Sequence, residues 1–458
     1  MEYLGISYSV KNMPSLDLAF IPFAAWADAY LAEAKRPLKI AIERENGRIS
    51  VFELMLRGKE FKRANLRFVE RYVKLLLWSV GGFRVHICGD DELAASLKEL
   101  YTLDGERTFD VQFMQDVYEK EFEIIARNES EFPKANEYAI CVGGHTNGCR
   151  IGFDAGGSDR KVSAVIDGKT VYSEEVVWHP KTSVDIRYQY DGIVSAFKTA
   201  ASKMPRVDGI GVSSAGVFVG NQAAVSSLFI KIPREMKSEV RTIYERAARE
   251  LGEIPLVVAN DGDVTALAGS MSLDANSIMG LAMGTSEAVG YVNNDGSILG
   301  WFNELAFAPV DLNEAAMQDE WSTDIGVGCK YFSQDAVIKL APQAGIELDP
   351  ALTPAEKLLE VQRMVQNGHV GAADIFKSIG VYLAHTLNLY AKLYDIRYLI
   401  VLGRVASGIG GELIVSECER VLGEEYPELA RQITVMLPNE EFRRVGQSMA
   451  AASLPEIK

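Results

Sequence analysis

The first third of the chain alternates between strand-like and helix-like patterns of apolar residues. Residues 39–44 and 49–56 alternate apolar and polar side chains on either side of Glu45-Asn46-Gly47, which predicts a β-hairpin. Residues 61–78 place apolar side chains at helical spacing, and Gly81-Gly82 then predicts the end of that helix. The pattern therefore predicts an α/β segment.

A polar stretch separates this segment from the rest of the chain. It follows a predicted strand over 84–88 and a predicted helix over 91–103. Residues 128–147 are mostly polar and are punctuated by proline and glycine, which is typical of a linker. We interpret residues 1–140 as an appended N-terminal α/β segment.

After the linker, strands and helices follow one another in two similar series. The first series is predicted to hold three antiparallel strands, a helix, a strand, a helix and a strand, over residues 151–154, 162–166, 170–177, 192–203, 209–212, 237–251 and 255–259. The second is predicted to hold a helix, a strand over 277–283, a hairpin at Asn294-Asp295-Gly296, and then mostly helix. Two such series predict an internally duplicated fold.

The first strand of the first series runs into a turn that could bind phosphate. In Asp154-Ala155-Gly156-Gly157-Ser158 the glycines allow backbone N–H groups to approach phosphate oxygens closely. Asp154 could hold Mg²⁺ through water, because that ion keeps much of its hydration shell. Taken alone, the same residues are at least as typical of an ordinary β-turn.

Asn260 and Asp261 follow the last strand of the first series. A carboxylate held at a strand end could accept the proton of a sugar hydroxyl during phosphoryl transfer, so Asp261 is the candidate general base and Asn260 a candidate substrate-binding residue. The alternative is that Asp261 is the N-cap of the next helix. We interpret Asp263 as a first-turn acid that interacts with the helix dipole.

Three later features complete the candidate site. Gly284-Thr285-Ser286 could form a second phosphate-binding turn or an ordinary hairpin turn. The apolar residues 399–402 lead into a loop that could pack on adenine and ribose or simply connect two elements, with glycines at Gly403, Gly408, Gly410 and Gly411. Glu304 is an acid in an apolar stretch, where it could bind sugar hydroxyls or form a salt bridge.

Composition excludes several classes of partner. With 47 Lys and Arg against 63 Asp and Glu, the formal net charge is −16, which argues against nucleic acid and anionic membranes. The five cysteines contain no CxxC pair and predict neither a disulfide framework nor a metal cluster. The start of the chain lacks the pattern of a targeting peptide, and the most apolar stretch, 73–80, is too short to span a membrane. We expect a cytoplasmic protein.

From about Cys149 onward the chain resembles the ROK sugar kinases and regulators, within the actin-like ATPase superfamily. Asp154 to Ser158 resembles the family's DxGGT phosphate motif, Ser214-Ala215-Gly216 its S-x-P-G turn, and Asn260-Asp261 its N-D pair. Gly284-Thr285 resembles the start of GTGxGGG, Asn303 to Phe307 resembles G-E-I-G-H, and Gly446 to Ala452 resembles the closing Gly-Ala helix. The resemblance implies that Ser214, Gly216 and Glu304 bind the sugar.

The resemblance also implies the architecture and the ligands. The expected fold class is α/β, with the duplicated domains of the actin-like ATPase (ribonuclease H-like) fold around an interdomain cleft. Residues 141–260 would form the first half, joined by a C-terminal helix at 440–458, and residues 261–439 the second half. ATP and Mg²⁺ are the expected cofactors and a small sugar the expected partner. We leave open whether the chain forms a homodimer.

The chain departs from the family at Phe307, Ser286 and Asp159 and in lacking most of a cysteine cluster. Phe307 stands where the family has a zinc-binding, sugar-contacting histidine, and Cys329 is the one cysteine retained from its CxCGxxGC cluster. No structural zinc is therefore expected. Ser286 replaces a glycine of the second phosphate turn, and Asp159 stands where lysine is common.

Two functions follow from the sequence. The first is an ATP-dependent sugar kinase with Asp261 as general base. The second is a non-catalytic regulatory protein that senses a sugar or nucleotide. The acidic runs Asp90-Asp91-Glu92 and Glu119 to Glu123 disfavour a DNA-binding N-terminal segment, and Asp154, Asn260 and Asp261 occur together, so we favour the kinase.

Overall fold

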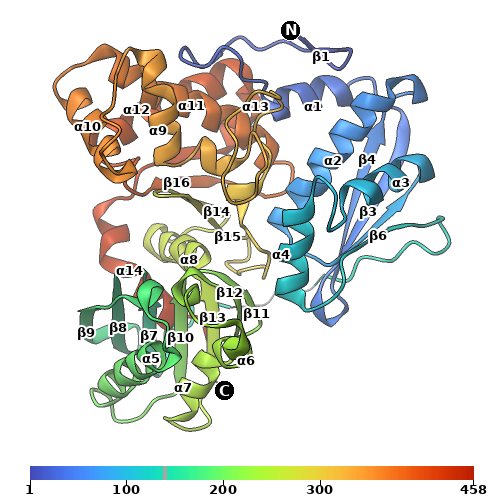
Figure 1. Ribbon diagram of the computed structural model, residues 1–458. Coiled ribbons are helices and arrows are strands. Elements are labelled where there is room, and N and C mark those ends of the chain that lie inside the picture. Colours follow the sequence, from blue (N-terminus) through green and yellow to red (C-terminus); the bar gives the residue numbers. More distant parts are fainter. Residues whose placement is uncertain (138–141, 458) are drawn as a thin grey trace.

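A mixed four-stranded sheet and three helices form what we call the N-terminal lobe (Figure 1). The computed structural model describes residues 1–137 and 142–457, and for residues 440–445 it describes the backbone alone. The sheet order is β4-β3-β5-β6, with strands Arg36–Glu43 (β3), Ile49–Leu56 (β4), Arg84–Cys88 (β5) and Glu123–Ala126 (β6). The helices are Lys62–Ser79 (α2), Asp91–Leu100 (α3) and Thr108–Tyr118 (α4), preceded by Glu2–Tyr3 (β1), Ile6–Ser7 (β2) and Phe23–Leu31 (α1). The predicted hairpin and the helix over 61–78 are confirmed, whereas the helix predicted over 91–103 ends three residues early.

A five-stranded sheet in the order β13-β10-β7-β8-β9 forms the first lobe. Its strands are Cys149–Ala155 (β7), Asp159–Ile166 (β8), Lys169–Val177 (β9), Gly209–Ser214 (β10) and Leu256–Asn260 (β13), and a small hairpin pairs Val217–Val219 (β11) with Gln222–Val225 (β12). The helix Ile186–Ala201 (α5) starts earlier than predicted, because Asp185 caps it. The single helix predicted over 237–251 is two helices, Lys237–Arg241 (α6) and Ile243–Arg249 (α7), because Thr242 is not helical.

The second lobe carries a four-stranded sheet in the order β15-β14-β16-β17. Its strands are Ile278–Met283 (β14), Glu287–Val292 (β15), Tyr398–Leu402 (β16) and Thr434–Met436 (β17). Its helices are Asp261–Leu273 (α8), Gln334–Leu340 (α9), Pro354–Gln366 (α10), Val370–Tyr390 (α11), Gly408–Glu425 (α12) and Pro427–Gln432 (α13).

The hairpin predicted at residues 294–296 is wrong, because β14 and β15 already turn at residues 284–286. Residues 293–327, all of which the structure describes, contain short 3₁₀ helix but neither α-helix nor named β-strand. Their backbone groups bond elsewhere: the N–H groups of Asn303 and Glu304 donate to the carbonyls of Ser79 and Trp78 at the end of α2. Residues 293–327 are therefore anchored on the N-terminal lobe.

The C-terminal helix Glu440–Ala452 (α14) returns to pack on β7, β10 and α8, between the first and second lobes (Figure 1). The approach is close enough to require glycine, because a Cβ on Gly152 or Gly211 would lie 1.7 Å from the carbonyl oxygen of Ser448 or Ala451. This packing supports the division into residues 1–140, 141–260 with 440–458, and 261–439, which we retain as a proposal.

The N-terminal lobe is attached differently to its two neighbours. Toward the second lobe it shares one continuous apolar core, in which Trp78 packs on Phe307 with ring centroids 4.4 Å apart. Toward the first lobe, α4 and α6 form ion pairs, such as Arg241 Nη1 to Glu119 Oε1 at 3.4 Å. Within the described part of the chain, no helix is long and apolar enough to cross a membrane.

Candidate active site

Three parallel strands of the first lobe end side by side and carry the first group of candidate residues. The register pairs Asp154 of β7 with Ser213 of β10, and Ser214 of β10 with Asn260 of β13. Carboxyl ends of parallel strands are the usual place for ligand-binding groups in open α/β sheets. The structure therefore brings together residues that lie about a hundred positions apart in the sequence.

Asp154 is held in place by its neighbour on β10. The Ser213 hydroxyl donates to Asp154 Oδ1 at 2.9 Å. Burial raises the pKa of Asp154 to about 6, and the charge of Asp261 adds to that rise while the Ser213 hydrogen bond opposes it. Asp154 as a residue is half-buried, so its side chain could still face a hydrated Mg²⁺.

The turn after Asp154 faces a lysine that sequence reasoning missed. A Cβ on Gly157 would lie 2.7 Å from Lys181 Cε and 3.0 Å from Nζ, so this side chain lies directly against the turn. Lys181 is exposed, and its charge also lowers the pKa of Asp261. No local pattern marks Lys181, because it belongs to a short 3₁₀ helix after β9.

The second phosphate turn joins β14 to β15. Its backbone closes on itself through Gly284 N–H donating to the carbonyl of Ser286 at 3.0 Å. Arg404 Nη2 donates to the Thr285 hydroxyl at 2.9 Å, which places a second cation beside the turn. Gly403 makes this possible, because its backbone (φ +94°) lies against Met283 where a Cβ would be 2.4 Å from the carbonyl oxygen.

The remaining glycines of this loop have different roles. Gly408 starts α12 with φ +62° and nothing within 4 Å of its Cβ position. A Cβ on Gly410 would meet the Phe376 ring at 2.7 Å, and one on Gly411 would meet the Ala406 carbonyl at 2.0 Å. Packing within the protein accounts for Gly410 and Gly411, so we no longer assign them a nucleotide contact.

Asn260, not Asp261, is the N-cap of α8. Its side-chain oxygen accepts from Gly262 N–H at 2.7 Å, and its side-chain nitrogen donates to the Gly216 carbonyl at 2.8 Å. Asp261 is thereby left as the first helical residue, with Oδ1 accepting from Gly262 N–H at 3.0 Å. Burial raises the pKa of Asp261, while this N–H group and Lys181 oppose the rise. The capping alternative for Asp261 is not what the structure shows.

Acids surround Asp261 on the side of the second lobe. Asp263 is buried and accepts from Tyr291 N–H at 3.1 Å and from Asn303 Nδ2 at 2.8 Å, so it links α8 to β15 and to the segment after it and is not a simple helix-dipole acid. Burial raises the pKa of Asp263 to about 7. Burial, with the charges of Asp261 and Asp263, raises the pKa of Glu304 to about 8. Both carboxyl groups, Asp263 and Glu304, are therefore at least partly protonated at neutral pH.

Ser214 and Gly216 differ in what they present. Ser214 is 0% exposed, and its hydroxyl is hydrogen-bonded to that of Tyr244 at 2.7 Å inside the first lobe. We therefore withdraw the direct sugar contact expected for Ser214. Gly216 presents its backbone, with φ +129° and its carbonyl on Asn260.

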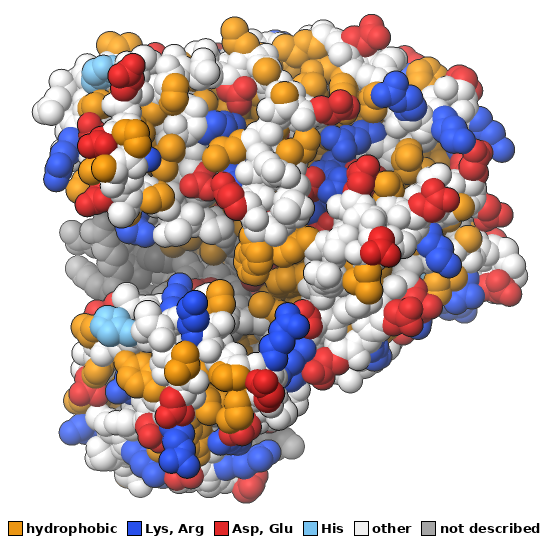
Figure 2. Space-filling view, viewed as in Figure 1, with side chains coloured by type: hydrophobic (Ala, Val, Ile, Leu, Met, Phe, Trp, Pro, Cys, Tyr) orange, Lys and Arg blue, Asp and Glu red, His pale blue; other side chains and the backbone are white. Residues whose placement is uncertain are grey.

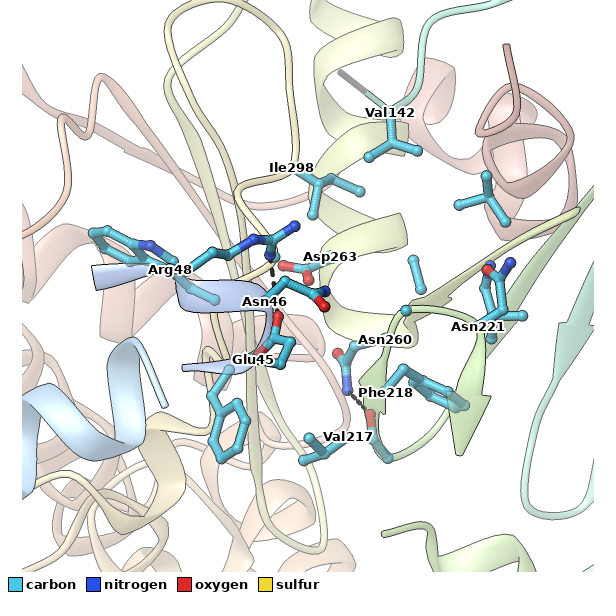
Figure 3. Close-up of a pocket in the computed structure, with 18 of the residues that line it drawn as sticks. Glu45, Asn46, Arg48, Val142, Val217, Phe218, Asn221, Asn260, Asp263 and Ile298 are labelled. Atoms are coloured by element: carbon cyan, nitrogen blue, oxygen red, sulfur yellow. Dashed lines mark hydrogen bonds and ion pairs between the residues drawn. The ribbon is translucent and has the colours of Figure 1, made fainter. Parts of the chain in front are cut away.

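A pocket of about 230 Å³ adjoins Asn260 and Gly216 (Figure 3). Figure 3 shows Asn260 and Asp263 on one side and the β3–β4 turn of the N-terminal lobe, Glu45 to Arg48, on the other. Sequence analysis gave this turn no part in the site, because nothing in a hairpin sequence shows which distant surface its tip will reach.

The place of the missing zinc ligand is apolar. Phe307 is buried against Trp78, and in the described residues no group of three or more His, Cys, Asp or Glu is arranged to hold a metal ion. Mg²⁺ needs fewer protein ligands than zinc, since it is commonly held by one or two carboxylates, phosphates and water. Asp154 fits that requirement.

Comparison with known proteins shows the fold. No family profile and no curated protein sequence matches the chain. Among solved structures, a ROK family transcriptional regulator, a homologue of the Escherichia coli MLC protein, matches 67% of this chain and 78% of its own at 14% identity and TM-score 0.52. A ROK hexokinase from Thermus thermophilus matches 66% and 96% at 18% identity and TM-score 0.51. The chain has the ROK-like, actin-like ATPase fold, as its sequence predicted.

Proposed function

We propose that the protein is an ATP-dependent phosphotransferase that acts on a hydroxyl group of a hexose or related sugar. The observation that supports this most is that each lobe carries a glycine turn with an adjacent cation, Lys181 on one and Arg404 on the other. The partly buried Asp261 is close enough to Lys181 for that charge to lower its pKa. A cleft opens between these two lobes in Figure 2.

The turns at Gly156 to Ser158 and Gly284 to Ser286 would hold the phosphates of ATP through backbone N–H groups, and Asp154 would hold Mg²⁺ through water. When bound, ATP supplies the phosphoryl group and Mg²⁺ neutralises its charge. Lys181 and Arg404 add positive charge from both lobes. Gly403 and Gly408 would lie along the adenosine.

Asp261 would act as general base. Its carboxylate accepts the hydroxyl proton as the acceptor oxygen bonds to phosphorus and ADP leaves. Asn260, the Gly216 backbone and Glu304 orient the acceptor. Glu304, protonated at neutral pH, can donate as well as accept a hydrogen bond. We further propose that the protein is cytoplasmic and holds no zinc.

A regulatory protein that binds sugar or nucleotide without turnover is the second candidate, because one of the similar structures is a ROK transcriptional regulator. ADP release measured over a panel of sugars and sugar acids with Mg·ATP separates the two. Sugar-dependent ADP formation is expected for the kinase. Saturable sugar binding without ADP formation would favour the regulator.

A further inference from the structure

Trp321 is unusually exposed for a tryptophan that has so many aromatic neighbours. It is 61% exposed, whereas Trp26, Trp78 and Trp178 are buried. Its ring meets those of Phe109, Phe113 and Phe307 edge-on, with centroids 5.6, 6.4 and 5.5 Å away. The three contacts fix the indole while much of its surface stays open.

The segment that carries Trp321 is anchored on both sides. Before it, Asp319 Oδ2 accepts from both the N–H and the hydroxyl of Ser322 at 2.7 Å. After it, the buried Asp324 pairs with Arg71 at 3.0 Å and Arg107 at 2.8 Å, both from the N-terminal lobe. A surface held this rigidly loses little conformational entropy when a ligand binds.

Phe307 connects the ring to Glu304, one of the proposed acceptor-binding residues, because the Phe307 N–H donates to the Glu304 carbonyl at 3.2 Å. Phe307, one of its three supports, closes the 3₁₀ turn that Glu304 begins. Figure 2 shows hydrophobic side chains gathered at the inner end of the cleft, where in Figure 1 the segment after β15 meets α4. Exposed aromatic surface of this kind in a monomer commonly marks a binding site.

We propose that Trp321 is a stacking platform for the ring of the acceptor, and that α4 of the N-terminal lobe holds this platform in place. The proposal rests on the proposed function. The face of an indole ring carries partial negative charge and attracts the weakly positive C–H groups on one face of a pyranose. The acids around Asp261 and Glu304 would bind the hydroxyl groups at the ring edge. The acceptor class is therefore a cyclic sugar with an apolar C–H face, in preference to an acyclic polyol.

In this proposal the N-terminal lobe holds Trp321 and its segment in position. Phe109 and Phe113 come from α4, and Arg71 and Arg107 from α2 and the residue before α4. They touch the platform or its anchor and not the acceptor, so they are positioning residues.

Quenching of tryptophan fluorescence by acrylamide tests the proposal directly, because Trp321 is the most exposed of the five tryptophans. Probes are D-glucose, D-mannose, D-galactose and N-acetyl-D-glucosamine, with sorbitol and mannitol as acyclic counterparts. We expect at least one of the cyclic sugars, and neither polyol, to protect the wild-type protein from quenching. Trp321→Phe should remove that protected component. Tyr188→Phe, at an exposed position on α5, is the matched control.

Steady-state kinetics give the second readout. Trp321→Ala should raise the KM for the sugar about 3- to 10-fold, with Trp321→Phe in between, while kcat and the KM for ATP change little. Phe109→Ala should give the same pattern more weakly. Unchanged sugar KM in Trp321→Ala, equal binding of polyols, or no protection by any of these cyclic sugars would overturn the platform. Protection without ADP release would support the platform and reject the kinase. Sugar-dependent ADP release that is unchanged in the Trp321 variants would support the kinase and reject the platform.

Discussion

Asp324 and Arg71 form a buried ion pair 3.0 Å long that joins the irregular segment of the second lobe to α2 of the N-terminal lobe. Lys74 and Arg107 also reach the same carboxylate, at 3.3 and 2.8 Å. These cations hold the pKa of Asp324 well below its usual range against the effect of burial. Glu70 also pairs with Arg71 and Arg107, both at 2.7 Å, and Asp110 pairs with Lys74 at 2.6 Å. Three carboxylates therefore face three buried cations.

Removing that carboxylate should destabilise the whole protein. Asp324→Asn leaves the three buried cations facing only Glu70 and Asp110, so one buried positive charge is uncompensated, and we expect a loss of about 3–5 kcal/mol in the free energy of unfolding. Denaturant unfolding checks this, with Glu33→Gln, whose partner Arg57 has other bonds, as control. A loss of less than 1 kcal/mol would mean that the network is not structural.

Asp261→Asn should abolish most phosphoryl transfer while the fold persists. Loss of a general base typically costs 10²- to 10⁴-fold in rate. Because burial raises the pKa of Asp261, wild-type activity should fall with decreasing pH at values above those of an ordinary aspartate. The matched control is Asp274→Asn at the far end of α8, where the backbone is left-handed and Asn is well tolerated. Normal turnover in Asp261→Asn would reject this base.

The close packing of α14 on β10 predicts how two glycine substitutions change stability. In Gly211→Ala the new Cβ meets the Ala451 carbonyl, and the strain should cost about 1–3 kcal/mol or more. Gly423→Ala, in a helix and with nothing within 4 Å, should instead stabilise by about 0.5–1 kcal/mol. Thermal and denaturant unfolding of the pair decide it: equal effects would show that α14 is not packed on β10 in this way.

Glu287 predicts an unusual dependence of stability on pH. It is 4% exposed, and burial raises its pKa to about 8, while a hydrogen bond with Tyr390 opposes that rise. The folded protein keeps this proton between about pH 4.5 and 8 while the unfolded chain releases it, so its contribution to stability falls as pH rises through that window.

Glu287→Gln removes this titration. The variant should gain stability relative to wild type as pH rises from 5 to 8, on the order of 1 kcal/mol per pH unit inside the window. Unfolding free energies at pH 5, 6.5 and 8 measure it, with the exposed Glu412→Gln as control. A constant difference across these pH values would show that Glu287 is ionised in the folded state.

Sequence reasoning located what depends on short-range pattern. Asp154 and Asn260 lie at the ends of apolar strands and Gly284 directly follows one, so their positions before a turn or helix could be predicted. Lys181 and Arg404 could not, because their relevance arises only when distant loops meet.

The two site assignments that we withdraw have the same origin. A motif match placed Ser214 in the site, but which way its hydroxyl points depends on Tyr244, thirty residues away. Glycines 410 and 411 looked like a ligand loop because close packing against Phe376 and Ala406 leaves the same sequence trace as close approach to a nucleotide. Local pattern cannot distinguish a ligand from a neighbouring helix.

The shared core of the N-terminal and second lobes bears on how the protein can be taken apart. A chain cut near residue 141 would leave Phe302, Phe307 and Tyr331 without the rings of Tyr118, Trp78 and Phe20 that now cover them. Such a fragment would contain every proposed nucleotide-binding residue and still be prone to aggregate, because the surface left behind is that of a divided core. The segment that the sequence presents as an appendage is therefore, for folding and for any attempt at truncation, an inseparable part of the protein.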